Sequence, residues 1–264
     1  MKNTEISWCH HTFNPWWGCQ KVSPGCVHCY AERLSKSVGS SLWGETAPRR
    51  FFGEKHWNDP LKWNAEVQAE GERKRVFCAS MADVFEDRAD LLAPRARLFR
   101  LIEATPNLDW LLLSKRPENF KALLPASWGK GWDNVWLGVT VENQQMANKR
   151  TPLLQEIPAA VRFLSCEPLL GVLTLELTNI HWVICGGESG YRYRPMKARW
   201  AAWLRDQCID QGVPFHFKQW GTSRPKESGR LLDGRTWDEF PTSPLHGDSF
   251  GPSAPAILCV SERS

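Results

Sequence analysis

The chain has 264 residues, of which 42% are hydrophobic and 23% charged, and its formal net charge is +4. This composition is ordinary for a globular protein and excludes a disordered, collagen-like or coiled-coil chain. No run of about 18 apolar residues occurs, so we expect no membrane-spanning helix. Residues 1–19 lack the apolar segment of an export signal, and we therefore expect a cytoplasmic protein. The mild positive charge permits a partner that carries phosphate without demanding one.

Short apolar segments alternate with segments of helical periodicity along most of the chain. Six apolar segments have the continuity of buried strands: 75–79, 110–113, 135–139, 162–164, 181–185 and 215–217. Helical patterns lie between them, such as Asp90–Glu103, and Lys197–Gln211 before Gly212. Strands that are apolar throughout are typical of a parallel sheet covered on both faces, and their alternation with helices predicts an α/β fold. We expect a full or partial parallel (β/α) barrel over residues 1–221. Residues 222–264 would form an irregular C-terminal extension, packed on the barrel or trailing from it.

A charged residue follows each predicted strand, near the point where the strand ends. These residues are Asp83, Lys115, Glu142, Glu167, Glu188 and Lys218. The carboxyl ends of parallel strands face the ligand, in barrels as in open sheets. We therefore predict that the six side chains converge on one mouth. The alternative is that strand ends are polar because they are hydrated.

Three cysteines stand close together near the amino end, in the segment Gly-Cys-Gln-Lys-Val-Ser-Pro-Gly-Cys-Val-His-Cys. Cys19, Cys26 and Cys29 could wrap a metal centre and leave one coordination position open. A structural zinc ion is normally closed by four ligands, whereas an iron–sulfur cluster held by three Cys keeps one iron free. Candidates for a fourth zinc ligand are His28, Cys9, His10 and His11. Three buried thiols without a metal are the remaining alternative.

The same segment carries a resemblance to a known family. Asn-Pro-Trp-Trp-Gly-Cys, followed by Cys-Val-His-Cys-Tyr-Ala-Glu-Arg, resembles the cluster loop of radical S-adenosylmethionine (radical SAM) enzymes, nearest the spore photoproduct lyase group. Six residues separate Cys19 from Cys26 where those enzymes have three, and His28 stands where an aromatic residue usually precedes the last Cys. Over nearly the whole chain the sequence is also similar to a phage and prophage family of unknown function. The shared blocks include Leu-Ser-Lys-Arg-Pro, Gly-Val-Thr-Val-Glu-Asn and Gly-Gly-Glu-Ser-Gly.

The radical SAM resemblance implies a partial barrel of that type, with two cofactors. Cys19, Cys26 and Cys29 would bind a [4Fe–4S] cluster, whose fourth iron chelates S-adenosylmethionine (SAM). Lys115 would meet the SAM carboxylate, and a strand-end Gly-Gly-Glu would meet its ammonium group, with a substrate or ribose contact as the alternative for the glutamate. The full set of candidate cofactor contacts is Tyr30, Ser80, Asp83, Ser114, Lys115, Glu142, Glu167, Gly186, Gly187, Glu188 and Lys218.

Two further features bear on the reaction. Cys166 and Cys185 end two strands and are candidate catalytic residues, either as hydrogen-atom donors or as an extra ligand; small buried hydrophobes are the alternative. Residues 191–199 interleave aromatic rings with cations, which suits stacking on bases and pairing with phosphate, or else forms a solvated loop.

We therefore predict a radical SAM-type enzyme that acts on a nucleotide or nucleic-acid substrate. It would receive electrons from a reductase or a flavodoxin-type donor, and whether the reaction is of lyase or transferase type stays open. The alternative is a zinc-stabilised module that binds nucleic acid or a partner without catalysis. A third possibility is a metal-independent, phosphate-handling barrel that uses Lys115, Lys218 and Glu188.

Overall fold

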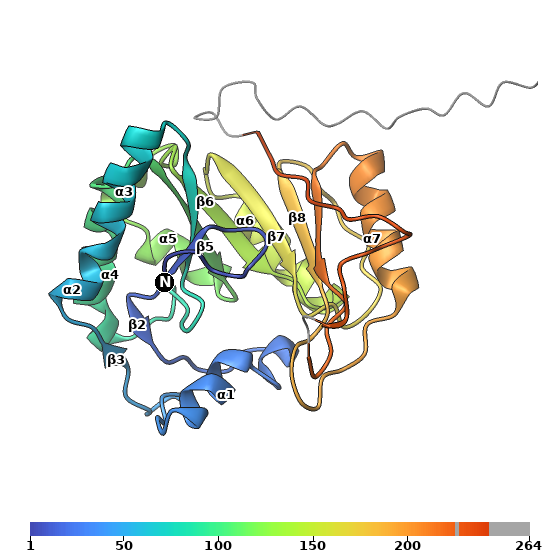
Figure 1. Ribbon diagram of the computed structural model, residues 1–264, viewed down its shortest axis with the longest axis horizontal. Helices are drawn as coiled ribbons and strands as arrows, with labels where there is room; N and C mark the ends of the chain where they lie inside the picture. The colour runs from blue at the N-terminus through green and yellow to red at the C-terminus, as the bar shows by residue number, and fades with distance from the viewer. Residues whose placement is uncertain (225–226, 243–264) are drawn as a thin grey trace, which may run out of the picture.

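One parallel sheet organises the protein. The computed structural model describes residues 1–224 and 227–242 (Figure 1). The sheet strands are β1 (His11–Phe13), β4 (Lys74–Cys78), β5 (Leu108–Ser114), β6 (Val135–Thr140), β7 (Val161–Cys166), β8 (Trp182–Gly186) and β9 (Phe215–Gln219). Their spatial order is β1-β4-β5-β6-β7-β8-β9, and every neighbouring pair runs parallel. A separate antiparallel pair joins β2 (Trp16–Trp17) to β3 (Arg50–Phe51).

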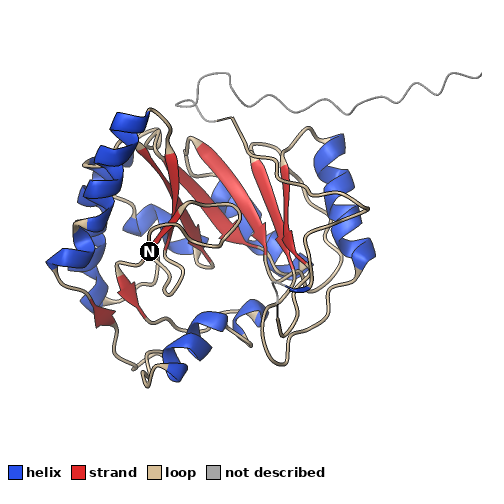
Figure 2. Ribbon diagram, viewed as in Figure 1, coloured by secondary structure: helices blue, strands red, loops and turns tan. Residues whose placement is uncertain are grey.

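Helices connect the parallel strands and flank the sheet (Figure 2). They are α1 (Tyr30–Ser37), α2 (Glu54–Trp57), α3 (Asp59–Glu70), α4 (Leu92–Glu103), α5 (Phe120–Leu123), α6 (Gln144–Gln155) and α7 (Ala198–Asp210). The described residues also form four short 3₁₀ helices: η1 (Pro24–Cys26), η2 (Ala89–Leu91), η3 (Pro117–Asn119) and η4 (Ala126–Trp128). Helix α6 begins where the Asn143 side chain caps the backbone N–H of Met146, and α3 ends at the left-handed Gly71. None of the described helices has the length and apolarity needed to cross a membrane.

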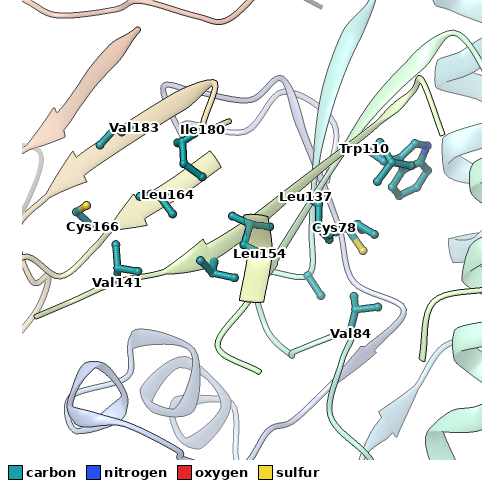
Figure 3. Close-up of a cluster of buried hydrophobic side chains, with 14 of the residues drawn as sticks. Cys78, Val84, Trp110, Leu137, Val141, Leu154, Leu164, Cys166, Ile180 and Val183 are labelled. Carbon is teal, nitrogen blue, oxygen red and sulfur yellow. The ribbon is translucent and has the colours of Figure 1, made fainter. Parts of the chain in front are cut away.

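Apolar side chains cover both faces of the sheet. Successive residues of a strand point to opposite faces, so Trp110 and Leu112 of β5 join one cluster while Leu111 joins the other. The larger cluster, part of which Figure 3 shows, also takes in side chains of the flanking helices. The smaller cluster includes Trp8 from the amino-terminal segment and Trp136 from β6. Burial on both faces explains why these strands are apolar throughout.

The predicted parallel α/β sheet is confirmed, in its partial form. All six predicted strands are present, and within the described residues β1 and β9 do not pair, so the barrel stays open. Strand β1 was not predicted, because His-Thr-Phe is too short and too polar to be recognised as a strand. Part of the predicted extension packs on the sheet through the buried Leu232 and Trp237, without regular helix or strand over 227–242. Residues 243–264 lie outside the described part of the chain, and the boundary after residue 221 stays a prediction.

Candidate functional site

The loop that carries the three cysteines lies at the carboxyl ends of the strands, next to α1 (Figure 1). Four strands are each followed by a residue that hydrogen-bonds to this loop or to the start of α1. Each of these residues lies two positions beyond the last residue of its strand. They are Ser80 after β4, Arg116 after β5, Glu142 after β6 and Glu188 after β8. Of the six residues predicted to converge, Glu142 and Glu188 are among these four. The convergence of all six on one mouth stays a prediction.

Arg116 holds the first cysteine of the loop. Its Nη1 lies 3.7 Å from the Cys19 sulfur, and its Nη2 donates to the Gln20 carbonyl at 2.8 Å. Burial of the sulfur, with the neighbouring Asp83 carboxylate, raises the pKa of Cys19 to about 12, although Arg116 acts in the opposite direction. The metal-free protein therefore holds Cys19 as a neutral thiol, and a metal that binds there must displace its proton.

Asp83 holds Arg116 in turn. Its carboxylate accepts a hydrogen bond from Nη1 of Arg116 at 2.9 Å and others from Ser114 Oγ at 2.7 Å and the Lys115 backbone N–H at 3.0 Å. The backbone N–H of Phe85 donates a fourth, at 3.0 Å. We predicted Asp83 and Ser114 as cofactor contacts; both side chains are buried and already engaged with each other.

Glu142 fixes the middle of the loop. Its Oε1 accepts a hydrogen bond from the backbone N–H of Gly25 at 2.9 Å, and its Oε2 pairs with Arg150 at 2.8 Å. A Cβ at residue 25 would lie only 3.1 Å from the carboxylate, so glycine allows this close approach. Burial alone would raise the pKa of Glu142, but Arg150 and the hydrogen bonds from Ser23 and Gly25 bring it below its ordinary value. The carboxylate is therefore charged at neutral pH.

Glu188 contacts the end of the cysteine loop that lies next to Cys29. Its Oε2 lies 3.0 Å from His28 Nδ1 and accepts hydrogen bonds from the backbone N–H and Nε of Arg194, at 2.8 and 2.9 Å. Arg194 also reaches the loop itself, because its Nη2 donates to the Pro24 carbonyl at 3.0 Å. Burial opposes the charge of Glu188, yet Arg194 and His28 hold its pKa below the ordinary value.

Tyr30 ties the start of α1 to the sheet. Its hydroxyl donates to the Ser80 carbonyl at 2.7 Å, and the Ser80 side chain is held by Asn14 at 3.0 Å. Both residues were predicted as cofactor contacts, and the structure brings them together at the mouth.

Two lysines of the predicted set differ in their partners. Lys218 Nζ pairs with Glu167 Oε1 at 3.0 Å, whereas Lys115 Nζ donates to the Thr140 hydroxyl at 3.3 Å. Lys115 has no carboxylate partner among residues 1–224 and 227–242, and the residue is only half-buried. It is therefore a cation with capacity for an anionic ligand.

The two strand-end glycines allow close contacts. A Cβ on Gly186 would lie 2.5 Å from Glu167 Oε1, and one on Gly187 would lie 1.8 Å from the Trp220 carbonyl oxygen. Only glycine fits these positions as the structure stands.

Cys166 and Cys185 lie deep in the larger apolar cluster, part of which Figure 3 shows. They are partners in register on β7 and β8, both are fully buried, and burial raises the pKa of each thiol well above its ordinary value. Their surroundings are those of small hydrophobic residues. A part in the reaction stays a prediction for both.

Arg116 and Arg150 were not predicted as part of the site, and Arg194 was predicted only as one of the cations of residues 191–199. Each pairs with a carboxylate near the mouth, and two of them also reach the cysteine loop. For Arg116 a signal was available, because it directly follows Lys115 in the strand-end Ser-Lys-Arg-Pro block.

The three cysteine sulfurs of the loop are the type of ligand that an iron–sulfur cluster requires. Cys19, Cys26 and Cys29 are free cysteines of one loop, and a cluster takes each thiolate on a different iron. Within the described residues, no three or more His, Cys, Asp or Glu side chains are arranged to hold a single metal ion. A cation beside the Cys19 sulfur also favours a thiolate ligand.

Fold and site together define an open parallel β/α barrel whose mouth is crossed by a thiol-bearing loop. A family model described as "Protein of unknown function (DUF5131)" matches residues 3–241, and the chain belongs to this family. That description contains nothing about phage, so a phage origin stays a prediction. Among curated proteins none matches.

One solved structure is similar over most of the chain. It is a double mutant of spore photoproduct lyase with bound AdoMet and dinucleoside spore photoproduct. The sequence identity is 12% and the TM-score is 0.44, with 78% of this chain and 62% of that chain covered. The chain thus spans less than two thirds of the length of that protein.

Proposed function

We propose that this protein is a radical SAM-type enzyme, in which Cys19, Cys26 and Cys29 hold a [4Fe–4S] cluster and SAM binds at the barrel mouth. The observation that carries the proposal is that the cysteine loop and the start of α1 are hydrogen-bonded to residues that lie two positions beyond four strand ends. When bound, a reduced cluster of this kind supplies the electron that cleaves SAM. A three-thiol site leaves a coordination position for such a ligand.

The residues around the loop fit the binding of a charged cofactor. Lys115 supplies an ammonium group that no described carboxylate neutralises, which suits the carboxylate of SAM. Gly186 and Gly187 let the Glu167 carboxylate and the Trp220 carbonyl pack closely against the end of β8 at this mouth. Tyr30 and Ser80 join the start of α1 to β4 at the same mouth.

A nucleotide or nucleic acid is the substrate class that the surface near Glu188 favours. Tyr191 is 75% exposed, and the Arg192 guanidinium lies 5.9 Å from its ring centroid. Lys197 Nζ lies 5.4 Å from the Trp200 ring centroid. An exposed ring beside a cation, such as Tyr191 beside Arg192, suits stacking on a base while the cation pairs with phosphate. The chemistry would also require a reductase or flavodoxin-type electron donor and a reducing compartment such as the cytoplasm.

Anaerobic reconstitution with iron and sulfide tests this proposal. We expect about four iron and four sulfide per wild-type chain, and 5′-deoxyadenosine after SAM and dithionite are added. Cys26→Ala should lose most of both. Cys208→Ala, which removes a buried thiol of α7 far from the loop in sequence, should retain both. A folded wild-type protein that takes up zinc and no iron would contradict the proposal.

One observation favours zinc as the second candidate. The His28 Nδ1 contact with Glu188 resembles the carboxylate that orients a metal-ligating histidine. A zinc site closed by His28 predicts that His28→Ala loses the metal and unfolds the protein. The cluster proposal predicts that His28→Ala keeps its iron, so this variant separates the two candidates.

A further inference from the structure

Arg116 is the one described side chain that donates hydrogen bonds to both Cys19 and the residue after it. Its Nη1 lies 3.7 Å from the Cys19 sulfur, and its Nη2 is bonded to the Gln20 carbonyl. The guanidinium is nearly inaccessible to solvent, with 7% of the side chain exposed. An electrostatic interaction in such a position is weakly screened by water and salt.

The position of Arg116 is itself fixed by the sheet. The Asp83 carboxylate accepts a hydrogen bond from Arg116 Nη1. The same carboxylate accepts hydrogen bonds from Ser114 at the end of β5 and from the backbone N–H of Lys115. Glu86 lies 4.0 Å from Arg116 on the other side and is paired with the buried Arg49. The planar fork of an arginine holds a carboxylate, a sulfur and a carbonyl in fixed directions on two nitrogen atoms, whereas a lysine has one nitrogen for all three.

We infer that Arg116 is a positioning residue that holds Cys19 for metal binding and stabilises the reduced state of the cluster; this inference rests on the proposed function. A thiolate-bound cluster becomes more negative when it gains an electron. A cation against one of its sulfurs therefore favours the reduced form and raises the reduction potential, since hydrogen bonds and charge near the sulfurs set that potential. The same contact fixes the loop before the metal arrives.

Arg116→Gln tests both parts of the inference. In iron-loaded protein, spectroelectrochemical titration should show a potential more negative than that of the wild type. In metal-free protein, backbone amides of residues 19–29 should exchange hydrogen on the order of tenfold faster, as expected for the loss of a hydrogen bond worth about 1.4 kcal/mol. Both readouts are independent of turnover.

Two further variants control for the loss of a buried arginine. Arg116→Lys keeps the positive charge, so its reduction potential should stay near the wild-type value. Its backbone amides at residues 19–29 should still exchange faster than those of the wild type. This variant replaces Arg116→Gln if Arg116→Gln fails to fold. Arg95→Gln removes a buried guanidinium that donates to the backbone carbonyls of Val84 and Glu86, and it should leave the potential unchanged.

An unchanged potential or unchanged exchange in Arg116→Gln overturns the inference, as does an equal shift in Arg95→Gln. If only Arg116→Lys folds, unchanged exchange in that variant overturns it. Failure of the proposed function looks different, because the wild type itself would then take up no iron and sulfide.

Discussion

The two ends of the cysteine loop are fastened in contrasting ways. At the Cys19 end, a buried cation faces the sulfur, and both members of the Asp83–Arg116 pair are 7% exposed. At the Cys29 end, the buried Glu188 binds groups that reach solvent, since His28 is 29% and Arg194 33% exposed. The first end is thus built into the sheet, whereas the second can adjust at the surface. If the loop holds a cluster as proposed, the buried end would fix the ligands and the exposed end could adjust to a second ligand.

The largest effect should come from breaking the buried pair. Asp83→Ala leaves Arg116 in the interior without its nearest carboxylate, and we expect a loss of about 3–5 kcal/mol in the free energy of unfolding. Urea denaturation of the metal-free protein measures this. As a control, Glu156→Ala removes an exposed partner of Lys121 and should cost less than about 1 kcal/mol. Equal losses for the two substitutions would contradict the conclusion that the buried Asp83–Arg116 pair stabilises the fold.

The contacts of Glu188 at the Cys29 end of the loop should contribute less to stability than the Asp83–Arg116 pair. Glu188→Ala removes hydrogen bonds from His28 and Arg194, but both groups can turn to water, so we expect about 1–3 kcal/mol. The same urea titration gives the value. A loss larger than that of Asp83→Ala would reverse the comparison between the two ends.

The middle of the loop offers a smaller perturbation. Gly25→Ala places a methyl group 3.1 Å from the Glu142 carboxylate, which must shift by a few tenths of an ångström, and we expect a cost of about 1 kcal/mol. Gly171→Ala, whose added methyl group would meet no atom within 4 Å, serves as the matched control. If both variants unfold at the same urea concentration, the loop does not press against Glu142.

The smallest effect should be a change in acid sensitivity. The pKa of Glu188 in the folded protein lies below its ordinary value of 4.5, because Arg194 and His28 outweigh the effect of burial. Its contribution to stability is therefore present above about pH 4.5 and is lost as the pH falls through the folded pKa. Glu188→Gln should show a shallower decline of unfolding free energy below about pH 4.5 than the wild type. If the unfolding free energy of Glu188→Gln falls as steeply as that of the wild type, other titratable groups determine the loss of stability at low pH.

Strand ends were predictable from the sequence because the strands are short, apolar and each followed by polar residues. The convergence of Glu142 and Glu188 on one mouth follows from parallel topology alone. Their partners could not be predicted, because an arginine such as Arg194 meets a loop 170 residues away through a flexible side chain. The same limit applies to Asp83, whose carboxylate turns towards Arg116 rather than outward.

The three thiols are proposed to hold a cluster with one iron open to SAM. Electron paramagnetic resonance of the reconstituted, dithionite-reduced protein, recorded with and without SAM, tests it most directly. We predict the signal of a reduced [4Fe–4S] cluster whose g-values change when SAM is added and do not change with adenosine alone. A signal that SAM leaves untouched, or a protein that binds only a diamagnetic ion, would contradict the account.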